Sequence, residues 1–166
     1  MKAKLLIMLM AGLFVVSNYV AQETIIDENQ PCSLFHIGDC GFKEELVNFE
    51  YNSQSRSGLC KRGETSSLYV VCYKGMDYRF AFCAKADLLE GKDMQVKIYE
   101  KKTKKLIYDS ASQNYETEFE FSCTNSISLL IEVILPKTAP VPENKFEFKG
   151  CVGTLMQSRK SLKTGF

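Results

Sequence analysis

The side chains in this sequence that are capable of nucleophilic or metal chemistry are seven cysteines and one histidine. His36 lies close to Asp39 and Cys40, and a cysteine becomes nucleophilic when a nearby base or cation favours its thiolate. The sequence contains no His-Glu-x-x-His, Gly-x-Ser-x-Gly or phosphate-cradling glycine loop, the motifs of common hydrolases and nucleotide-binding proteins. We therefore predict no catalytic residue and no enzymatic activity.

The cysteines indicate disulfide bonds rather than a metal site. Structural zinc sites favour Cys-x-x-Cys spacing, which does not occur here, so we predict that the chain binds no metal and no cofactor. Because seven is odd, three bridges at most can form within one chain, and spacing alone leaves open both their connectivity and the unpaired residue. The candidates are Cys32, Cys40, Cys60, Cys72, Cys83, Cys123 and Cys151.

Two groups of carboxylates could in principle form a glycosidase pair or a calcium site. Glu118 and Glu120 could serve as a glycosidase pair, but their spacing of two places both on one face of a strand, where we predict a solvated surface. The loop from Asp87 to Asp93 includes Glu90 and could supply oxygen ligands to calcium. It lacks an alternating Asp-x-Asp pattern, so we predict a hydrophilic turn.

Four tyrosines are candidates for a binding surface. If side chains alternate between two faces, Tyr69, Tyr73, Tyr99 and Tyr108 are exposed, and exposed aromatic rings stack on sugars or dock partner proteins. The sequence contains no tryptophan, which favours a protein over a carbohydrate. Edge strands of the expected sheets offer unpaired backbone groups as a second route to binding.

The N-terminus indicates an exported protein, and the net charge argues against one class of partner. The formal net charge is +1, with 21 basic and 20 acidic residues, which argues against a nucleic-acid partner. Met1 to Ala21 has two lysines followed by an apolar run from Leu5 to Val16, the pattern of a signal peptide. The run is shorter than the ~20 residues of a membrane-spanning helix. We predict cleavage after Ala21 or Ser17, and release into the periplasm or outside the cell with no transmembrane segment.

Alternation of apolar and polar residues predicts strands rather than helices through most of the mature chain. Tyr78, Phe80 and Phe82 share one face of such a strand and are predicted to be buried. Gly75 in the preceding four-residue connection indicates a β-hairpin. Further alternation is found around Val47–Tyr51, Leu68–Tyr73, Met94–Tyr99, Leu106–Asp109, Glu118–Cys123 and Ile127–Leu135.

The ends of the mature chain differ from its middle. Gln22 to Pro31 is a polar lead, and the prolines between Pro136 and Glu143 must interrupt a strand because proline lacks an amide donor. A last strand is expected from Phe146 to Met156. Gln157 to Phe166 is polar and basic and is expected to form a flexible tail.

These observations predict an all-β fold, a single antiparallel β-sandwich of the jelly-roll kind with seven or eight strands over residues 22–166. The spacing of the strands supports one domain, and the sequence shows no internal repeat.

The later part of the chain resembles small exported β-sandwich proteins of Bacteroidetes, a family with no assigned activity. The segments that carry the resemblance are Lys74–Phe80, Val96–Glu100, Leu106–Asp109, Phe119–Phe121, Ile131–Val133, Cys151–Met156 and Lys163–Phe166. The strand order is also similar to that of jelly-roll accessory domains of secreted peptidases, which are non-catalytic. The resemblance implies a fold and a compartment, and the high cysteine count departs from it.

The sequence thus predicts a non-catalytic secreted binding or structural module. Its partner is expected to be a protein or another component of the cell envelope. The alternative is a carrier of small lipids or other apolar ligands, held between the sheets among Phe80, Phe82, Phe119 and Phe121. A secreted hydrolase is the third alternative. The sequence does not indicate an oligomeric state.

Overall fold

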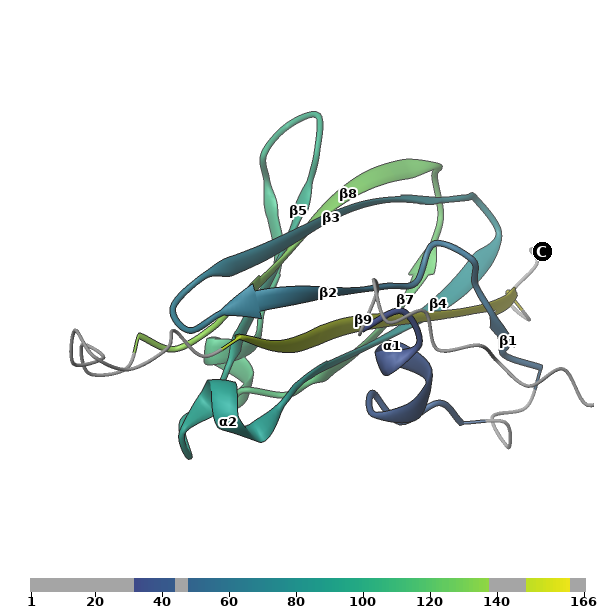
Figure 1. Cartoon of the computed structure of the whole chain (residues 1–166). Helices are drawn as coiled ribbons and strands as arrows, with labels where there is room; N and C mark the ends of the chain where they lie inside the picture. The colour runs from purple at the N-terminus through teal and green to yellow at the C-terminus, as the bar shows by residue number, and fades with distance from the viewer. Residues whose placement is uncertain (1–31, 44–47, 138–148, 162–166) are drawn as a thin grey trace, which may run out of the picture.

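The computed structural model describes residues 32–43, 48–137 and 149–161, which form two antiparallel β-sheets packed face to face (Figure 1). The predicted all-β sandwich is therefore confirmed, with nine strands in the described part of the chain. The expected signal peptide, the polar lead, and Phe146 and Phe148 lie outside the described residues.

The five-stranded sheet is built around its long strand β9 (Lys149–Lys160). β4 (Met76–Ala84) pairs with one side of β9, and β1 (Glu50–Tyr51) and β2 (Arg56–Lys61) pair one after the other with the opposite side. β7 (Glu118–Cys123) pairs with β4 and ends the sheet. The sequence did not predict β2, because its residues are mostly small or polar and show no clear alternation.

The four-stranded sheet has the order β3-β8-β5-β6, with every pair antiparallel. Its strands are β3 (Thr65–Cys72), β8 (Ile127–Ile134), β5 (Gln95–Glu100) and β6 (Leu106–Asp109). These bounds agree closely with the alternation in the sequence. β3 and β6 are the two edges of this sheet.

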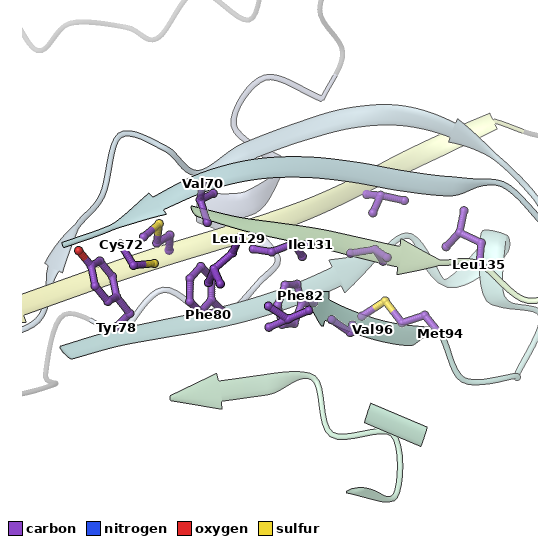
Figure 2. Close-up of a cluster of buried hydrophobic side chains, with 14 of the residues drawn as sticks. Val70, Cys72, Tyr78, Phe80, Phe82, Met94, Val96, Leu129, Ile131 and Leu135 are labelled. Carbon is purple, nitrogen blue, oxygen red and sulfur yellow. The ribbon is translucent and has the colours of Figure 1, made fainter. Parts of the chain in front are cut away.

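The main core lies between the two sheets (Figure 2). Tyr78, Phe80 and Phe82 are buried as predicted, and the Phe80 ring stacks on those of Phe119 and Phe121 at centroid distances of 6.5 and 6.2 Å. From the opposite sheet, alternate residues of β8 such as Ile131 point into the same cluster. Burial of each such side chain contributes about 1.5–3 kcal/mol.

The predicted hairpin at Gly75 is wrong, because β3 and β4 belong to different sheets. The chain crosses from one sheet to the other between Cys72 and Met76. Gly75 has a φ of +80°, which favours glycine, and its N–H donates to the carbonyl of Cys123 at 2.8 Å. A hairpin and a crossing both need a tight turn, so the residues of the turn do not distinguish them.

The expected flexible tail begins later than the sequence indicated, because β9 continues to Lys160. Gln157 is fully buried, and Arg159 pairs with Asp77 at 3.2 Å and lies over the Phe49 ring at 4.3 Å. These contacts explain why polar and basic residues remain in the sheet. Residues 162–166 lie outside the described part.

The first described segment, residues 32–43, lies across the outer face of the five-stranded sheet, and we call it the cover segment. It contains the single-turn helix α1 (Phe35–Gly38), which contacts β9. The other helical turns are α2 (Ala86–Leu89) and the 3-10 turn η1 (Ser110–Gln113). Within the described ranges, no helix has the length and apolar character needed to cross a membrane.

Candidate functional site

The outer face of the four-stranded sheet carries a row of apolar side chains that crosses all four strands. In the strand register, Tyr69 of β3 lies opposite Leu130 of β8, Leu130 opposite Tyr99 of β5, and Tyr99 opposite Leu106 of β6. Tyr69 is 56% exposed and Leu106 is 46% exposed, while the two central residues are half-buried. We call these four residues the apolar row.

Charged groups surround the apolar row on two sides. The neighbouring row in the same register is polar and contains Glu132, Lys97 and Asp109. On the other side, the Lys101 ammonium lies 4.2 Å from the centre of the Tyr69 ring, an arrangement in which the π-electrons attract the cation.

The turn between β5 and β6 adds a concentration of positive charge. Figure 1 shows this turn projecting beyond the body of the sandwich. Its exposed lysines are Lys101, Lys102, Lys104 and Lys105. The turn starts next to Tyr99 and ends next to Leu106, so one end of the apolar row is bordered by positive charge.

Of the four tyrosines predicted to be exposed, the structure confirms Tyr69 and Tyr73, the latter 60% exposed. Tyr99 lies on the outer face but is half-buried. Tyr108 is wrongly predicted: its ring packs on Phe119 at 4.6 Å, and its hydroxyl donates to the Glu116 carbonyl. A register shift in β6 opposite Ile98 and Tyr99 changes the alternation, so that Tyr108 faces inward.

Sequence reasoning missed two members of the row, Leu130 and Leu106. Leu130 stands between Ser128 and Glu132 on the polar side of an alternating strand, and this apolar interruption was the available signal. Leu106 could be placed only once the register shift in β6 was known.

The edge of β3 is partly closed by a side chain. The amide of Gln54 donates to the carbonyl of Val71 at 2.9 Å and accepts from the Val71 N–H at 2.8 Å. The next edge donor, the N–H of Tyr73, is bound by the Tyr78 hydroxyl at 2.7 Å. An incoming strand would have to displace these bonds, which makes this end of β3 a poor site for strand addition.

His36 lies in the cover segment and is buried, and its environment does not support the Cys-His hypothesis. Cys40 is bonded to Cys83 and so has no thiol, and Asp39 pairs with Lys85. The His36 ring instead contacts Ser57 through Nδ1 at 2.5 Å and the Tyr51 hydroxyl through Nε2 at 3.1 Å.

These contacts fix the cover segment to β1 and β2. Because Ser57 Oγ also accepts from the His36 backbone N–H, its own hydrogen is free to donate to Nδ1, which leaves Nε2–H to donate to Tyr51. This arrangement requires a neutral ring. Burial, assisted by the positive charge of Arg56, lowers the pKa of His36, which agrees with that state.

Two disulfides attach the cover segment to the sheet beneath it. Cys32 is joined to Cys151 of β9, and Cys40 to Cys83 of β4, with Cα separations of 5.4 and 4.9 Å. Gly153 of β9 lies opposite Cys83, and a Cβ there would approach Cys40 Sγ to 2.7 Å. Disulfides form and persist in oxidising compartments, so the bridges favour an exported protein. The remaining cysteines are buried thiols: Cys60, Cys72 and Cys123.

The predicted solvated role of Glu118 and Glu120 holds only for Glu120, which is exposed. Glu118 pairs with the fully buried guanidinium of Arg79 at 2.7 Å and with Lys43 at 3.1 Å. Burial opposes the ionisation of Glu118, but the hydrogen bonds from Arg79 and Lys43 outweigh it and lower its pKa. Arg79 also donates to Gln157 at 2.6 Å, so this network is part of the covered face.

The acidic loop that was considered for calcium has other partners. Asp87 lies in the first turn of α2 and its carbonyl accepts from Arg62, and the Glu90 carboxylate forms an ion pair with the same arginine. In the part of the chain that the structure describes, no three histidine, cysteine or acidic side chains are gathered as metal ligands.

Comparisons with known proteins add little to what the geometry shows. No family model matches the sequence, and no curated protein matches it. Among solved structures, the chain is similar to the crystal structure of Aeromonas hydrophila PliG, a periplasmic lysozyme inhibitor of g-type lysozyme. The identity is 8%, the match covers 72% of this chain and 92% of that chain, and the TM-score is 0.45. At this level the likeness carries no information about what the present chain binds.

Proposed function

We propose that the chain is an exported, non-catalytic module that binds a protein through the apolar row on its four-stranded sheet. The observation that carries the proposal is the register that aligns Tyr69, Leu130, Tyr99 and Leu106 across the sheet, with its two ends exposed to solvent. Contiguous apolar surface of this kind is costly in water and marks interaction sites.

The composition of the row suits a protein partner. Tyrosine contributes a large contact area with few rotatable bonds and carries a polar hydroxyl, and it is enriched among the residues that dominate binding energy. Tyr69 and Tyr99 stand on non-adjacent strands with Leu130 between them, which gives an apolar centre. The polar row beside it would form the rim.

The lysines at one end of the row indicate the charge of the partner. Lys102 and Lys104 are exposed at the tip of the β5–β6 turn. A partner surface with an apolar centre and acidic residues along one side would complement this arrangement. We therefore propose that the partner's binding surface is acidic rather than basic.

The lipid-carrier alternative is less well supported by the packing. Phe80, Phe82, Phe119 and Phe121 stack on one another in the core, with centroid separations from 5.7 to 6.5 Å. These rings therefore occupy the space in which the sequence suggested that an acyl chain could lie.

The proposal can be tested by comparing what three forms of the immobilised protein retain from a cell-envelope extract. The wild type and the control Leu59→Ser should retain the same protein, because Leu59 is an exposed leucine on the other sheet. Tyr69→Ser combined with Leu106→Ser should weaken its binding by about tenfold or more, as expected for loss of two large apolar contacts. Equal retention by all three forms, or no retained protein, would contradict the proposal.

The charge of the partner requires a separate measurement. Lys102→Glu combined with Lys104→Glu should slow association with the retained protein, and the effect should shrink as the salt concentration rises. A faster association would indicate a basic partner surface and overturn this part of the proposal while leaving the apolar row unaffected.

A further inference from the structure

Three cysteines remain as thiols in the structure, and two of them lie at the same end of the sandwich. Cys72 is the last residue of β3, and Cys123 is the last residue of β7. Both belong to the main core cluster, and both are buried, with exposed fractions of 0% and 4%. In Figure 2, Cys72 lies at the end of the core that also holds Tyr78.

Two crossings of the chain between the sheets bring these residues together. The first leads from Cys72 to Met76, and the second from Cys123 to Ile127. In the strand register, Cys72 lies opposite Ile127 in one sheet, and Met76 lies opposite Cys123 in the other. Each cysteine is thus the first residue of one crossing and lies opposite the last residue of the other crossing. The two crossings therefore run side by side.

Two hydrogen bonds donated by backbone N–H groups hold the two crossings against each other. The N–H of Gly75 donates to the carbonyl of Cys123 at 2.8 Å, and the N–H of Lys74 donates to the Ser126 hydroxyl at 3.1 Å. Both cysteine side chains point inward, as the burial pattern of β3 and β7 shows. The two side chains therefore enter the same end of the core from opposite sheets, where the Cys123 thiol donates to the Asn125 carbonyl at 3.0 Å.

The electrostatics of the two sulfurs agree with this placement. Burial raises the pKa of Cys72 to about 12, and the neighbouring Cys123 adds to the effect. The same two thiols contribute to a raised pKa of Tyr78, for which burial is again the main cause. The three groups thus form one local cluster.

The third thiol is too far away to pair with either member. Cys60 lies opposite Gly150 near the start of β9, whereas Cys123 lies opposite Met76, which in turn lies opposite Lys160 at the other end of β9. Cys60 lies in β2 and is hydrogen-bonded to Ser66 near the start of β3. Cys72 is at the far end of β3, and a strand rises about 3.3 Å per residue, which places it roughly 20 Å from Ser66. A disulfide needs Cα atoms within about 7 Å, so Cys60 cannot bond to Cys72 in the folded chain.

We propose that Cys72 and Cys123 form a third disulfide that joins the two sheets, and that Cys60 is the unpaired cysteine. Each thiol loses a proton and one electron as the S–S bond forms, and the two electrons and two protons reduce a small-molecule or protein disulfide to two thiols. The proposal rests on export to an oxidising compartment and not on the identity of a binding partner.

Disulfide mapping of the protein secreted through an oxidising compartment tests the proposal. The chain is denatured, alkylated with iodoacetamide without reductant, digested, and analysed by mass spectrometry. We expect one alkylated cysteine, Cys60, and a cross-linked peptide pair that contains Cys72 and Cys123. Alkylation of both Cys72 and Cys123 in molecules whose Cys32–Cys151 and Cys40–Cys83 bridges are intact would overturn the proposal.

Thiol counts of variants provide an independent check. Cys60→Ser should leave no alkylated cysteine, whereas Cys72→Ser should leave two, because Cys123 loses its partner. Cys60→Ser with two remaining thiols would overturn the proposal. The peptide map of the wild type decides the question even if Cys72→Ser does not fold.

Discussion

The two outer faces of the sandwich differ in whether another segment of the chain covers them. On the five-stranded sheet, the cover segment lies over small residues such as Ala81 and Gly153 and is attached by two disulfides. On the four-stranded sheet, the corresponding face carries large side chains, Tyr69 and Leu106 among them, which remain exposed. Small residues allow a second layer of chain to approach the sheet, whereas large ones would hold it away.

This difference separates residues that stabilise the chain from residues that are available to a partner. Arg79 and Gln157 point away from the main core and would face solvent in a sandwich of two sheets alone. Both are fully buried because the cover segment lies over them and its backbone carbonyls accept hydrogen bonds from their side chains. The apolar row has no such layer among the described residues. We therefore expect changes in the covered face to reduce stability and changes in the open face to reduce binding.

The largest effect on stability should follow removal of the Cys32–Cys151 bridge. These residues are 119 positions apart, so the bridge closes a loop that includes most of the described residues. The double substitution Cys32→Ser and Cys151→Ser should lower the free energy of unfolding by about 4 kcal/mol, measured by guanidinium denaturation. The control, Cys60→Ser, removes a cysteine that is unbonded in the structure and should cost about 1 kcal/mol. Equal losses would show that the cover segment adds little.

A smaller loss is expected for Glu118→Gln, which leaves the buried Arg79 guanidinium with a neutral partner. Removal of one member of a buried ion pair costs about 3–5 kcal/mol, and we expect about 2 kcal/mol because Glu118 is 38% exposed. Glu120→Gln, on the same face of the same strand, is the matched control and should change stability by less than about 0.5 kcal/mol. Denaturant titration of both variants at neutral pH measures the difference.

The same carboxylate predicts how acid affects the covered face. The folded state lowers the pKa of Glu118, so its contribution to stability is complete above the ordinary value of 4.5 and is lost as the pH falls through the folded pKa. Thermal denaturation of the wild type should show this loss below pH 4.5, and Glu118→Gln should show a shallower decline. Parallel profiles would contradict the assignment.

His36 should produce a weaker pH effect at higher pH. Its pKa is lowered in the folded state, so the unfolded chain takes up a proton first as the pH falls below 6.5, and stability decreases until the folded pKa is reached. His36→Gln should remove this part of the pH dependence between neutral pH and pH 5. If the variant retains the full slope, then His36 is not the group responsible.

The smallest effect on stability is expected on the open face. Tyr69→Ser should change the free energy of unfolding by no more than about 0.5 kcal/mol, because the side chain is 56% exposed and its ring lies under the exposed Lys101 ammonium. A loss as large as that of Glu118→Gln would mean that the apolar row stabilises the sheet, and it would remove the distinction between the two faces.

The sequence predicts the core better than it predicts the faces. Alternation in β4 correctly placed Tyr78, Phe80 and Phe82 inward, because a strand places alternate residues on opposite faces wherever it lies. It did not indicate that Arg79 and Ala81 are also buried, since that depends on a cover segment about forty positions earlier. Such contacts between distant segments leave no periodic pattern in either one.

The candidate site was predicted in part, and for a related reason. Tyr69 and Tyr99 were identified from the alternation within their own strands. The row itself depends on the register between four strands, and one of those registers contains a shift that reverses Tyr108. Register is set by turns and cross-strand contacts, which a single sequence does not display.

The side chain of Gln54 has a consequence for assemblies of this protein. Its amide binds both backbone groups of Val71 and so stands in for the peptide group of an absent neighbouring strand. Edge-to-edge growth of the four-stranded sheet is therefore obstructed at this part of the β3 edge. A second molecule could add a strand there only by breaking both hydrogen bonds of the Gln54 amide, so a single glutamine protects this edge against polymerisation by sheet extension.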